Sequence, residues 1–475
     1  MLLACQYLDM QGLKYSYFVN DNRFHGFTLS PEVLRGYLVI AVDFDLVEEL
    51  PALVENDVVV ISIDHHEIQD TLVEEYKDGE LRGIVVNNQY PFEPADNRYQ
   101  SGAGMVYETF CKIDENFKST ERESIVGITL LSDIRPIENA KAKAYLKTTY
   151  SSDSTRGYIG YLVAAVTKSD FGFGIPRMDR NFIDYTFSPT LNSMLRFGLT
   201  TEAIDLIFGK GLTVSGTKEK QAELVQLMKQ RASYLDLENC VIICVDEADF
   251  KDCQGVHLSN FIGLLASGIK GVGKSALAFT YKNGAVIRAS FRGRYDEVQY
   301  RQALCDMGID AEGHACAFGI LNFKPDADTW REINNVIGKL DAGHVSTAKV
   351  MEVSNLSFVL MSKGYQIATE NCYVRDMFRT YFRYVGKKAR VIRTTYKSVP
   401  FTDADAKCGL KPDKTSSGQR LKYLRDSEGK PIPKYVEYCV DGKIVKSFGV
   451  SIDEGDILPI MEKGTIQLYV RERVR

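Results

Sequence analysis

The segment Ile61-Ser62-Ile63-Asp64-His65-His66-Glu67 places a carboxylate and two imidazoles at the end of an apolar run. The run has the length and composition of a strand. In parallel α/β sheets the carboxyl ends of the strands form the ligand crevice, so polar side chains placed there converge on one site. We therefore expect a functional site at Asp64, His65 and His66.

Two further acidic segments, Val42-Asp43-Phe44-Asp45 and Ser132-Asp133, are expected to end strands at the same edge. Carboxylate oxygens combined with imidazole suit Mn²⁺ or Mg²⁺ better than thiolate-preferring metals, and such sites activate water against phosphoesters. The Asp-His-His tripeptide alone is explained equally well by a strand end whose polar side chains only form hydrogen bonds with the backbone. The three acidic ends together favour a metal site.

Around these segments, short apolar runs alternate with helical patterns, which is typical of a parallel α/β sheet. The expected strands are residues 15–19, 38–44, 58–63 and 83–87, and the expected helices are residues 104–112 and 122–131. Residues 140–215 have mostly helical spacing. These patterns predict that residues 1–214 form one α/β domain.

The rest of the chain divides into three further parts. The polar sequence at 215–236 contains a run without Gly or Pro and predicts a solvent-exposed connector helix. Residues 237–345 read as a smaller α/β domain, with strands at 241–245, 276–281 and 285–291 and helices at 259–267 and 297–306. Residues 346–475 are rich in short strands with turn signals such as Asp441-Gly442, which predicts a β-rich module.

Composition excludes several classes of protein. The chain has 475 residues, of which 45% are hydrophobic and 25% charged, so it is a soluble-type globular sequence rather than a disordered one. No apolar run approaches the roughly 20 residues that a bilayer requires, and residues 1–7 lack the features of a signal peptide. The ten cysteines include no Cys-x-x-Cys pair. We expect a cytoplasmic protein without membrane contact, disulfide framework or structural zinc.

The chain resembles the DHH phosphoesterase superfamily, and within it the RecJ-like single-strand exonucleases. The resemblance extends in chain order over about the first 330 residues. It rests on these segments: 22–32, 42–45, 64–66, Asn87-Asn88, SGAGMVYE at 101–108, GITLLSDIRPIEN at 127–139, FSPTLNSMLRFG at 187–198, SFRG at 290–293 and EGHACAFG at 312–319. The implied fold is a parallel-sheet DHH domain followed by a smaller DHH-associated α/β domain.

The resemblance implies a site with two Mn²⁺ or Mg²⁺ ions. Asp43, His65 and Asp133 match positions of metal ligands. Asp64 is implied to orient an imidazole or to complete the ligand set, and His66 to lie beside the scissile phosphate.

A second set of matching residues is implied to bind the nucleic-acid substrate from the associated domain and the helical region: Arg292, Gly313, His314, Asn192 and Arg196. We expect Gly313 to allow a close approach of the backbone to a phosphate. The chain departs from the family at Glu312, where a glycine is usual. A carboxylate beside a phosphate pocket is unfavourable, so we expect either that its side chain points away or that the pocket is weakened.

Family members begin with a strand that ends in Asp-x-Asp-x-Asp-Gly, and Leu2–Gly12 resembles the apolar helix that follows this motif. We expect the motif to lie upstream of Met1, in a longer product or in a second piece. The alternative is that Met1 is the true start and the metal site is reduced. The function expected below assumes that the motif is available.

The segment Gly268–Ser275 fits the phosphate-binding pattern G-x-x-x-x-G-K-S. Such a loop follows a strand and opens a helix, whereas here the predicted order is reversed. The pattern therefore indicates a lysine-bearing turn rather than a nucleotide-triphosphate site.

Basic and aromatic residues are concentrated towards the C-terminus. Residues 375–425 contain 14 basic and four acidic residues, although the whole chain has a net charge of −5. Within residues 375–397, tyrosines and phenylalanines alternate with the cations. This combination suits single-stranded nucleic acid, in which cations neutralise phosphates and rings stack on unpaired bases. An amphipathic helix with core aromatics and a solvated basic face explains the pattern equally well.

The sequence thus predicts a cytoplasmic, metal-dependent phosphodiesterase that removes nucleotides from single-stranded DNA in recombination, repair or replication. The 5′-to-3′ polarity is implied by the RecJ resemblance alone. The expected partner is single-stranded nucleic acid, DNA in preference to RNA, and no protein partner is predicted. The alternatives are a hydrolase of short oligoribonucleotides or nucleotide phosphates, and a non-catalytic protein that binds single strands.

Overall fold

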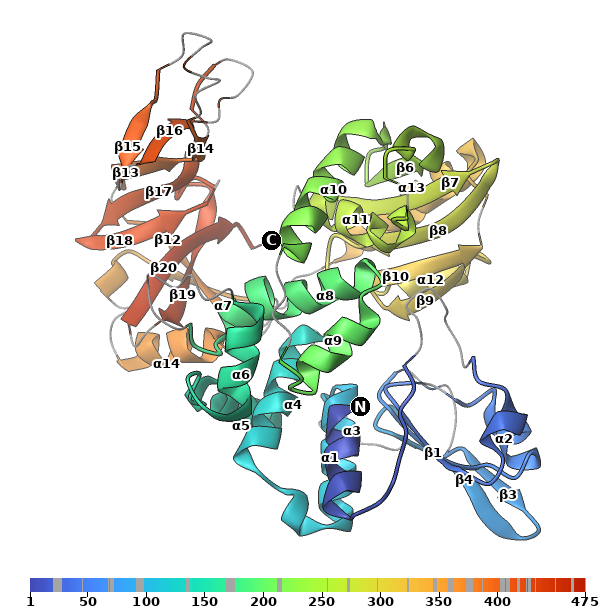
Figure 1. Ribbon diagram of the computed structural model, residues 1–475. Helices are drawn as coiled ribbons and strands as arrows, with labels where there is room; N and C mark the ends of the chain where they lie inside the picture. Colours follow the sequence, from blue (N-terminus) through green and yellow to red (C-terminus); the bar gives the residue numbers. More distant parts are fainter. Residues whose placement is uncertain are drawn as a thin grey trace. The chain divides into compact units, whose positions relative to one another are not determined.

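The computed structural model describes residues 1–19, 28–44, 46–66, 68, 72–90, 98–133, 137, 139–167, 176–211, 216–253, 255–270, 274–296, 298–322, 324–344, 348–357, 362–372, 379–386, 388–401, 406, 411–416, 419–423, 425, 429–431, 433–448, 450–462 and 465–474. The chain divides into two compact units, Met1–His344 and Val345–Arg475 (Figure 1). The mixed α/β architecture with parallel strands and the β-rich C-terminal region confirm the predicted fold class.

The first sheet has the strand order β1 (Leu38–Val42), β2 (Val59–Asp64), β4 (Glu80–Asn87), β3 (Glu74–Lys77). The strands β1, β2 and β4 are parallel, whereas β3 runs antiparallel to β4. The parallel strands are rich in β-branched residues, which suit a pleated surface packed on its faces. Because the first three strands are parallel, the residues that follow them meet at one edge. The strand expected at 15–19 is wrong, since those residues have no regular structure.

Helices pack around this sheet. They begin with α1 (Leu2–Met10), η1 (Pro31–Leu34), α2 (Leu50–Glu55), α3 (Gly102–Ile113), η3 (Glu115–Phe117) and α4 (Thr120–Ser132). Leu50, Leu53 and Val54 of α2 pack into a buried apolar cluster with Val60 and Val85 of the sheet. In Figure 1, α1 and α3 lie side by side, and the rings of Tyr7 and Phe110 stack between them at 4.2 Å.

The predicted helical region follows, and its segments are α5 (Ala140–Ser151), α6 (Gly157–Val166), α7 (Arg180–Phe182), the π-helical turn η4 (Ile183–Phe187), α8 (Ser188–Arg196), α9 (Thr200–Ile207) and α10 (Thr217–Arg231). On α10, Leu224 and Met228 are buried and most other side chains are exposed, as expected of a connector. Within the described residues, every helix is too short or too polar to cross a bilayer.

A six-stranded sheet completes the first unit, in the order β5 (Ser233–Asp236), β6 (Cys240–Asp246), β7 (Ser275–Lys282), β8 (Ala285–Arg292), β10 (Ala317–Asn322), β9 (Asp310–His314). Only the β6–β7 pair is parallel among these described strands. The other elements here are η5 (Glu247–Phe250), η6 (Leu258–Asn260), α11 (Ile262–Lys270), α12 (Tyr300–Cys305) and α13 (Ala327–Gly343). Alternating residues of β6 and β7 enter two separate apolar clusters, so both faces of the sheet are covered.

The P-loop-like segment lies between α11 and β7, in the reversed order expected from the sequence. Lys274 Nζ donates to Asp236 Oδ1 and to the Leu237 carbonyl, each at 2.7 Å. This lysine therefore ties β5 to β7. Residues 271–273 lie outside the described part of the chain.

The second unit contains a seven-stranded sheet in the order β11 (Lys349–Val353), β12 (Thr380–Tyr384), β19 (Gly455–Glu462), β20 (Thr465–Glu472), β18 (Lys443–Ser447), β17 (Pro433–Val440), β13 (Arg390–Tyr396). Beside these are α14 (Ser362–Asn371) and a small sheet of β14 (Ser398–Pro400), β16 (Gln419–Tyr423) and β15 (Lys414–Ser416). The β17–β18 hairpin turns at Asp441-Gly442, both with positive φ, as the sequence signal predicts.

The basic and aromatic segment is divided between structural and exposed positions. Arg379 and Phe382 are buried, and Arg383 pairs with the fully buried Asp456. By contrast, Arg390 and Arg393 are exposed on β13. The alternative of an amphipathic helix is wrong for residues 380–384 and 390–396, which are strands. Residues 373–378 and 387 lie outside the described part.

Candidate metal centre and anion pocket

Asp43 is placed by the turn that follows β1. Its backbone N–H donates to the Ile63 carbonyl of β2 at 2.9 Å, and its φ of 61° lies in the left-handed region, which aspartate tolerates better than most residues. The carboxylate lies against Gly102 at the start of α3, where a Cβ would come within 2.1 Å of Asp43 Oδ1. A helix N-terminus favours an adjacent anion. Strand pairing and a side-chain-free glycine together position this carboxylate.

His65 follows β2 and is 2% exposed. Its Nε2 lies 3.0 Å from Asp43 Oδ1, and its Nδ1 lies 3.6 Å from Asp133 Oδ2. The imidazole is therefore held between two carboxylates from distant parts of the sequence. Among the described residues, Nδ1 is buried and makes no hydrogen bond.

Asp133 does not end a strand, as the sequence analysis expected, but directly follows helix α4. The C-terminal end of a helix carries partial negative charge and is unfavourable for a carboxylate. Asp133 still approaches His65, as predicted. Its position next to other acidic groups is more favourable when a cation is also present.

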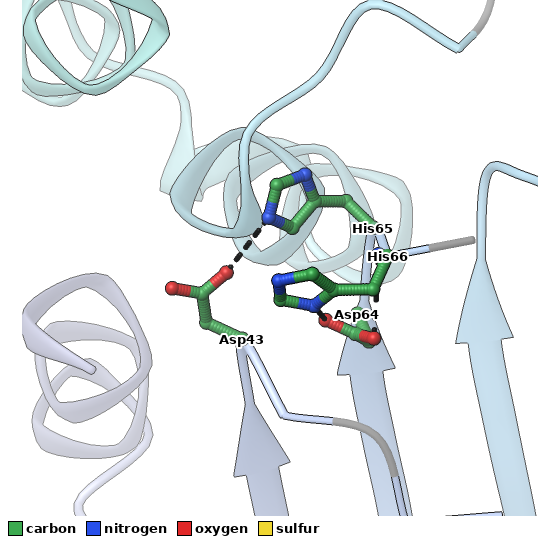
Figure 2. A group of neighbouring side chains, drawn as sticks. All are labelled: Asp43, Asp64, His65 and His66. Carbon is green, nitrogen blue, oxygen red and sulfur yellow. Dashed lines mark hydrogen bonds and ion pairs between the residues drawn. The ribbon is translucent and has the colours of Figure 1, made fainter. Parts of the chain in front are cut away.

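Asp64 and His66 form a second pair beside the first (Figure 2). Asp64 is 1% exposed at the end of β2, and its Oδ1 lies 2.7 Å from His66 Nδ1. The His66 backbone carbonyl accepts a hydrogen bond from Asn87 Nδ2 at the end of β4. Asp64 therefore fixes the orientation of the His66 ring and leaves Nε2 as the ring nitrogen turned away from this bond.

Neighbouring charges shift two pKa values in this cluster. The hydrogen bond to Asp64 raises the pKa of His66 to about 9; burial opposes this effect, and the charges of Asp64, Asp43 and Asp133 add to it. Desolvation raises the pKa of Asp43, but the hydrogen bond with His65 and the charges of His65 and His66 outweigh it and leave the pKa below its ordinary value. The cluster therefore favours an ionised Asp43 and a protonated His66.

The residues present fit a divalent metal ion. Asp43, Asp64, His65 and His66 each offer a ligand atom, and these atoms lie within 4.8 Å of one another. The buried Nδ1 of His65 without a hydrogen bond is the state expected of an imidazole nitrogen that ligates a metal. Carboxylate oxygens and imidazole are the donor set of Mn²⁺ and Mg²⁺ sites.

The first unit also contains a cavity of about 330 Å³. It is lined by Arg196, Ser259, Asn260, Gly263, Arg288, Ser290, Arg292, Glu312, Ala317 and Gly319, among others. Side chains of Arg288, Ser290 and Arg292 share one face of β8, because alternate strand residues point the same way. On the neighbouring strand β10, Ala317 and Gly319 are small and leave space above the sheet.

The arginines of this cavity are close to one another. Burial lowers the pKa of Arg292, and burial together with the charge of Arg292 lowers the pKa of Arg196. Gly263 of α11 admits the guanidinium, since a Cβ there would lie 2.7 Å from Arg292 Nη2. Two half-buried like charges are unfavourable together, and an anion such as phosphate would relieve their repulsion. We refer to this cavity below as the anion pocket.

The predicted substrate residues are only partly brought together. Arg196 and Arg292 line the pocket, whereas Asn192 is exposed on α8 and does not contribute to the described lining. His314 is exposed at the end of β9. Gly313 has φ 128°, and a Cβ there would lie 3.0 Å from Phe318 Cα, so packing of β9 on β10 accounts for this glycine.

Glu312 does line the pocket, so its side chain is not directed away from it. The register pairs Gly319 with both Ser290 and Glu312, which places the carboxylate across β10 from the β8 arginines.

Other residues were missed from the sequence. Arg288 and Ser290 could have been found from their spacing of four and two residues before Arg292 on a predicted strand. Gly102 has no such signal, because its contact with Asp43 joins segments 59 residues apart. Asp45 and residues 22–27 of the family-like segments lie outside the described part of the chain.

Comparisons with known proteins agree with this fold. No family model and no curated protein matches the chain. Among solved structures, RecJ from Thermus thermophilus in complex with Mn²⁺ is similar, with a TM-score of 0.59, 14% identity and coverage of 99% of this chain and 65% of that chain. An exonuclease RecJ bound to manganese matches with a TM-score of 0.48, 17% identity and coverage of 72% and 86%. The chain thus spans about two thirds of the length of the Thermus protein and shares its fold.

Proposed function

We propose that this chain, which has the RecJ-like fold of the DHH phosphoesterases, is a metal-dependent phosphodiesterase that removes nucleotides from the 5′ end of single-stranded DNA. The observation that carries the proposal is the buried His65 imidazole between the carboxylates of Asp43 and Asp133. A buried imidazole between two acids at the ligand-binding edge of a parallel sheet has little structural purpose unless it helps to hold a cation.

Asp43, His65 and Asp133 would hold Mn²⁺ or Mg²⁺, and Asp64 lies close enough to Asp43 and His65 to contribute a further ligand atom to a two-metal site. When bound, such a cation polarises the phosphoryl group and activates water. The RecJ structures from Thermus thermophilus are complexes with these same two metals, Mn²⁺ in one and Mg²⁺ in the other.

The side chains of this chain would bind the substrate strand and orient its phosphates. Asp64 holds His66 Nδ1, so that the opposite ring nitrogen is available to donate to a phosphate oxygen or to the departing nucleotide. The anion pocket would hold another phosphate of the same strand through Arg196 and Arg292. A terminal phosphate carries more charge than an internal one, so this pocket would favour a strand that ends in a phosphate; the 5′ polarity in the proposal is supported by the RecJ-like fold alone.

The test is hydrolysis by the purified chain in Mn²⁺, with a long 5′-phosphorylated single strand as substrate. We expect release of mononucleotides, loss of activity in EDTA, and loss in Asp133→Asn. The control variant is Asp328→Asn, which removes an exposed carboxylate on α13 and should keep full activity.

Other outcomes would contradict the proposal in different ways. Activity confined to RNA of a few nucleotides would indicate a small-substrate hydrolase. Tight binding of single strands without hydrolysis, in any concentration of Mn²⁺ or Mg²⁺, would indicate a binding protein. Release that begins at the 3′ end would overturn the polarity alone.

A further inference from the structure

Glu312 lies across one strand from the arginines of the anion pocket. The strand β10 separates β8 from β9 (Figure 1), and its residue Gly319 is paired with Ser290 on one side and with Glu312 on the other. Residues directly opposite on antiparallel strands share a face, so the Glu312 side chain is on the face that carries Arg288 and Arg292. Neighbouring strands are about 4.8 Å apart, so the Glu312 and Ser290 backbones are about 10 Å apart, with no side chain on Gly319 between them.

Neutral acceptors hold two of the guanidinium groups in this pocket. Arg292 Nη1 donates to Ser290 Oγ at 2.9 Å and to the Phe291 carbonyl at 2.6 Å. Arg196 Nη1 donates to Gln221 Oε1 at 3.0 Å. Within the described residues, neither of these arginines forms an ion pair with a carboxylate. The bonds therefore fix the guanidinium groups in position and leave their positive charge available to a ligand.

The Glu312 carboxylate lines the same cavity and is also unpaired. In the part of the chain that the structure describes, it forms no hydrogen bond and no ion pair, although Arg196, Arg288 and Arg292 line the cavity with it. A carboxylate that served only to neutralise the arginines would form an ion pair with one of them. The cavity instead has guanidinium groups on one side and a free acceptor on the other. Such a cavity suits a ligand that carries an anionic group and, close to it, a hydrogen-bond donor.

A ribonucleotide has both groups. Its phosphate suits the arginines, and the sugar bonded to that phosphate carries a 2′-hydroxyl, which deoxyribose lacks. Acidic side chains accept hydrogen bonds from ribose hydroxyls in dinucleotide-binding folds. A deoxyribonucleotide would leave the Glu312 carboxylate and the phosphate with no donor between them, which is unfavourable for two negative charges. The amino groups of the bases are donors too, but they lie farther from the phosphate than the sugar does.

We propose that Glu312 makes the anion pocket selective for a ribonucleotide, by accepting a hydrogen bond from the 2′-hydroxyl of the nucleotide whose phosphate the arginines hold. Glu312 is then a specificity-determining residue. The strand that binds best has ribose in its terminal phosphorylated nucleotide, as in a DNA strand with one ribonucleotide at its 5′ end. The inference rests on the proposed function in that it takes the bound end to be a nucleotide, but it does not depend on hydrolysis.

The test compares two fluorescent, 5′-phosphorylated oligothymidylates that differ only in the presence or absence of the 2′-hydroxyl in the first nucleotide. Their dissociation constants for the full chain are measured by anisotropy in EDTA, so that no hydrolysis takes place. We expect the wild type to bind the strand with the ribose about 10-fold more tightly, because a site that bonds a hydroxyl group rejects an analogue that lacks it.

Substitution of Glu312 should change the preference rather than abolish binding. In Glu312→Ala the ratio of the two affinities should fall to about 1, because the acceptor is gone. The same variant should bind the deoxyribose strand more tightly than the wild type does, because the negative charge beside the phosphate is also gone. Glu312→Gln should keep part of the preference, since its amide oxygen still accepts a hydrogen bond. The matched control is Asp310→Ala, which removes another exposed carboxylate of β9 that is not part of the described lining and should keep the wild-type ratio.

Three results would overturn the proposal. The first is equal affinity of the wild type for the two strands. The second is an unchanged preference in Glu312→Ala when thermal unfolding shows this variant to be folded. The third is a preference that follows the identity of the first base instead of its sugar. Hydrolysis of the same strands in Mn²⁺ is measured separately. Its absence together with an intact ribose preference would count against the proposed function alone, whereas equal affinities together with hydrolysis would count against this inference alone.

Discussion

The Asp43 carboxylate lies directly against Gly102, so closely that a methyl group at residue 102 would place its carbon 2.1 Å from Asp43 Oδ1. We predict that Gly102→Ala displaces this carboxylate and lowers metal affinity and hydrolysis by about 10- to 100-fold, the range seen when the support of a metal ligand is removed. Stability should change little, since alanine is a better helix former than glycine. The measurements are Mn²⁺ titration calorimetry and phosphodiester hydrolysis.

Gly268→Ala is the control for the glycine substitution. Gly268 is also helical, and a Cβ there would meet only the flexible end of Lys229. This variant should keep the metal affinity of the wild type. Equal metal affinity in Gly102→Ala and the wild type would show that Asp43 is not a ligand or that it can move freely.

Metal binding should stabilise the first unit. A ligand that binds only the folded state at a concentration about 100 times its dissociation constant raises the free energy of unfolding by about 2.7 kcal/mol. We expect Mn²⁺ to raise the thermal midpoint of the wild type, and we expect a much smaller rise in His65→Ala and Asp43→Asn. Asparagine is chosen at 43 because it tolerates the positive φ of that residue. An equal rise in all three proteins would place the metal elsewhere.

The central pair of the site could be predicted from the sequence for a simple reason. Asp43 and His65 each follow a strand, and β1 and β2 pair in parallel, so the two residues must meet at one edge. Asp133 was also predicted to join them, but on the mistaken assumption that it ends a strand. The family resemblance, rather than the local pattern, grouped Asp133 with His65, and the two side chains lie 3.6 Å apart.

The rest of the site depends on packing that no local pattern encodes. The anion pocket requires α8, η6, α11 and three strands of the second sheet to come together, and Arg196 and Arg292 are 96 residues apart in the chain. The basic and aromatic segment shows the same limit. Its composition fitted nucleic-acid binding and a structural role equally well. In the structure Arg379 and Arg383 bond to other parts of the fold, and whether an arginine is paired with a buried acid depends on strands far away in sequence.

The arginines of the anion pocket should strengthen the binding of a phosphorylated substrate. Arg196→Gln or Arg292→Gln should raise KM for a 5′-phosphorylated strand by about 10-fold or more, because a charge-assisted bond to phosphate is worth about 1.5–3 kcal/mol. The same variants should affect a strand with a 5′-hydroxyl much less. Arg82→Gln, which removes a partly exposed arginine on β4, is the control. An equal effect on both substrates would show that the pocket does not bind the terminal phosphate.

Ionisation of Asp341 should make the stability of the protein depend on pH. Burial raises the pKa of this carboxyl, whereas the hydrogen bond from Tyr300 and the charges of Arg294 and His344 only partly oppose the rise. The folded state therefore holds the proton more tightly than the unfolded state, and stability falls as pH rises from the ordinary aspartate value through the raised one. Asp341→Asn keeps an oxygen for Tyr300 but does not ionise.

The measurement for Asp341 is the thermal midpoint of both proteins at several pH values. Relative to the wild type, the asparagine variant should become more stable as pH rises through this window, and the difference should be constant above it. A difference that does not change with pH would show that Asp341 has an ordinary pKa.

The last prediction concerns Arg383, whose guanidinium forms two bonds of 2.9 and 3.0 Å with the fully buried carboxylate of Asp456. The Val474 backbone N–H also donates to this carboxylate, at 2.8 Å. Arg383→Met should destabilise the second unit by about 3–5 kcal/mol, because it leaves a buried charge without its partner. In Arg383→Met with Asp456→Asn, much of that loss should be recovered, since the remaining group is neutral and can still accept from Val474. Denaturant unfolding of the variants gives these free energies. If Arg383→Met weakened single-strand binding without loss of stability, the arginine would instead act as part of a nucleic-acid surface.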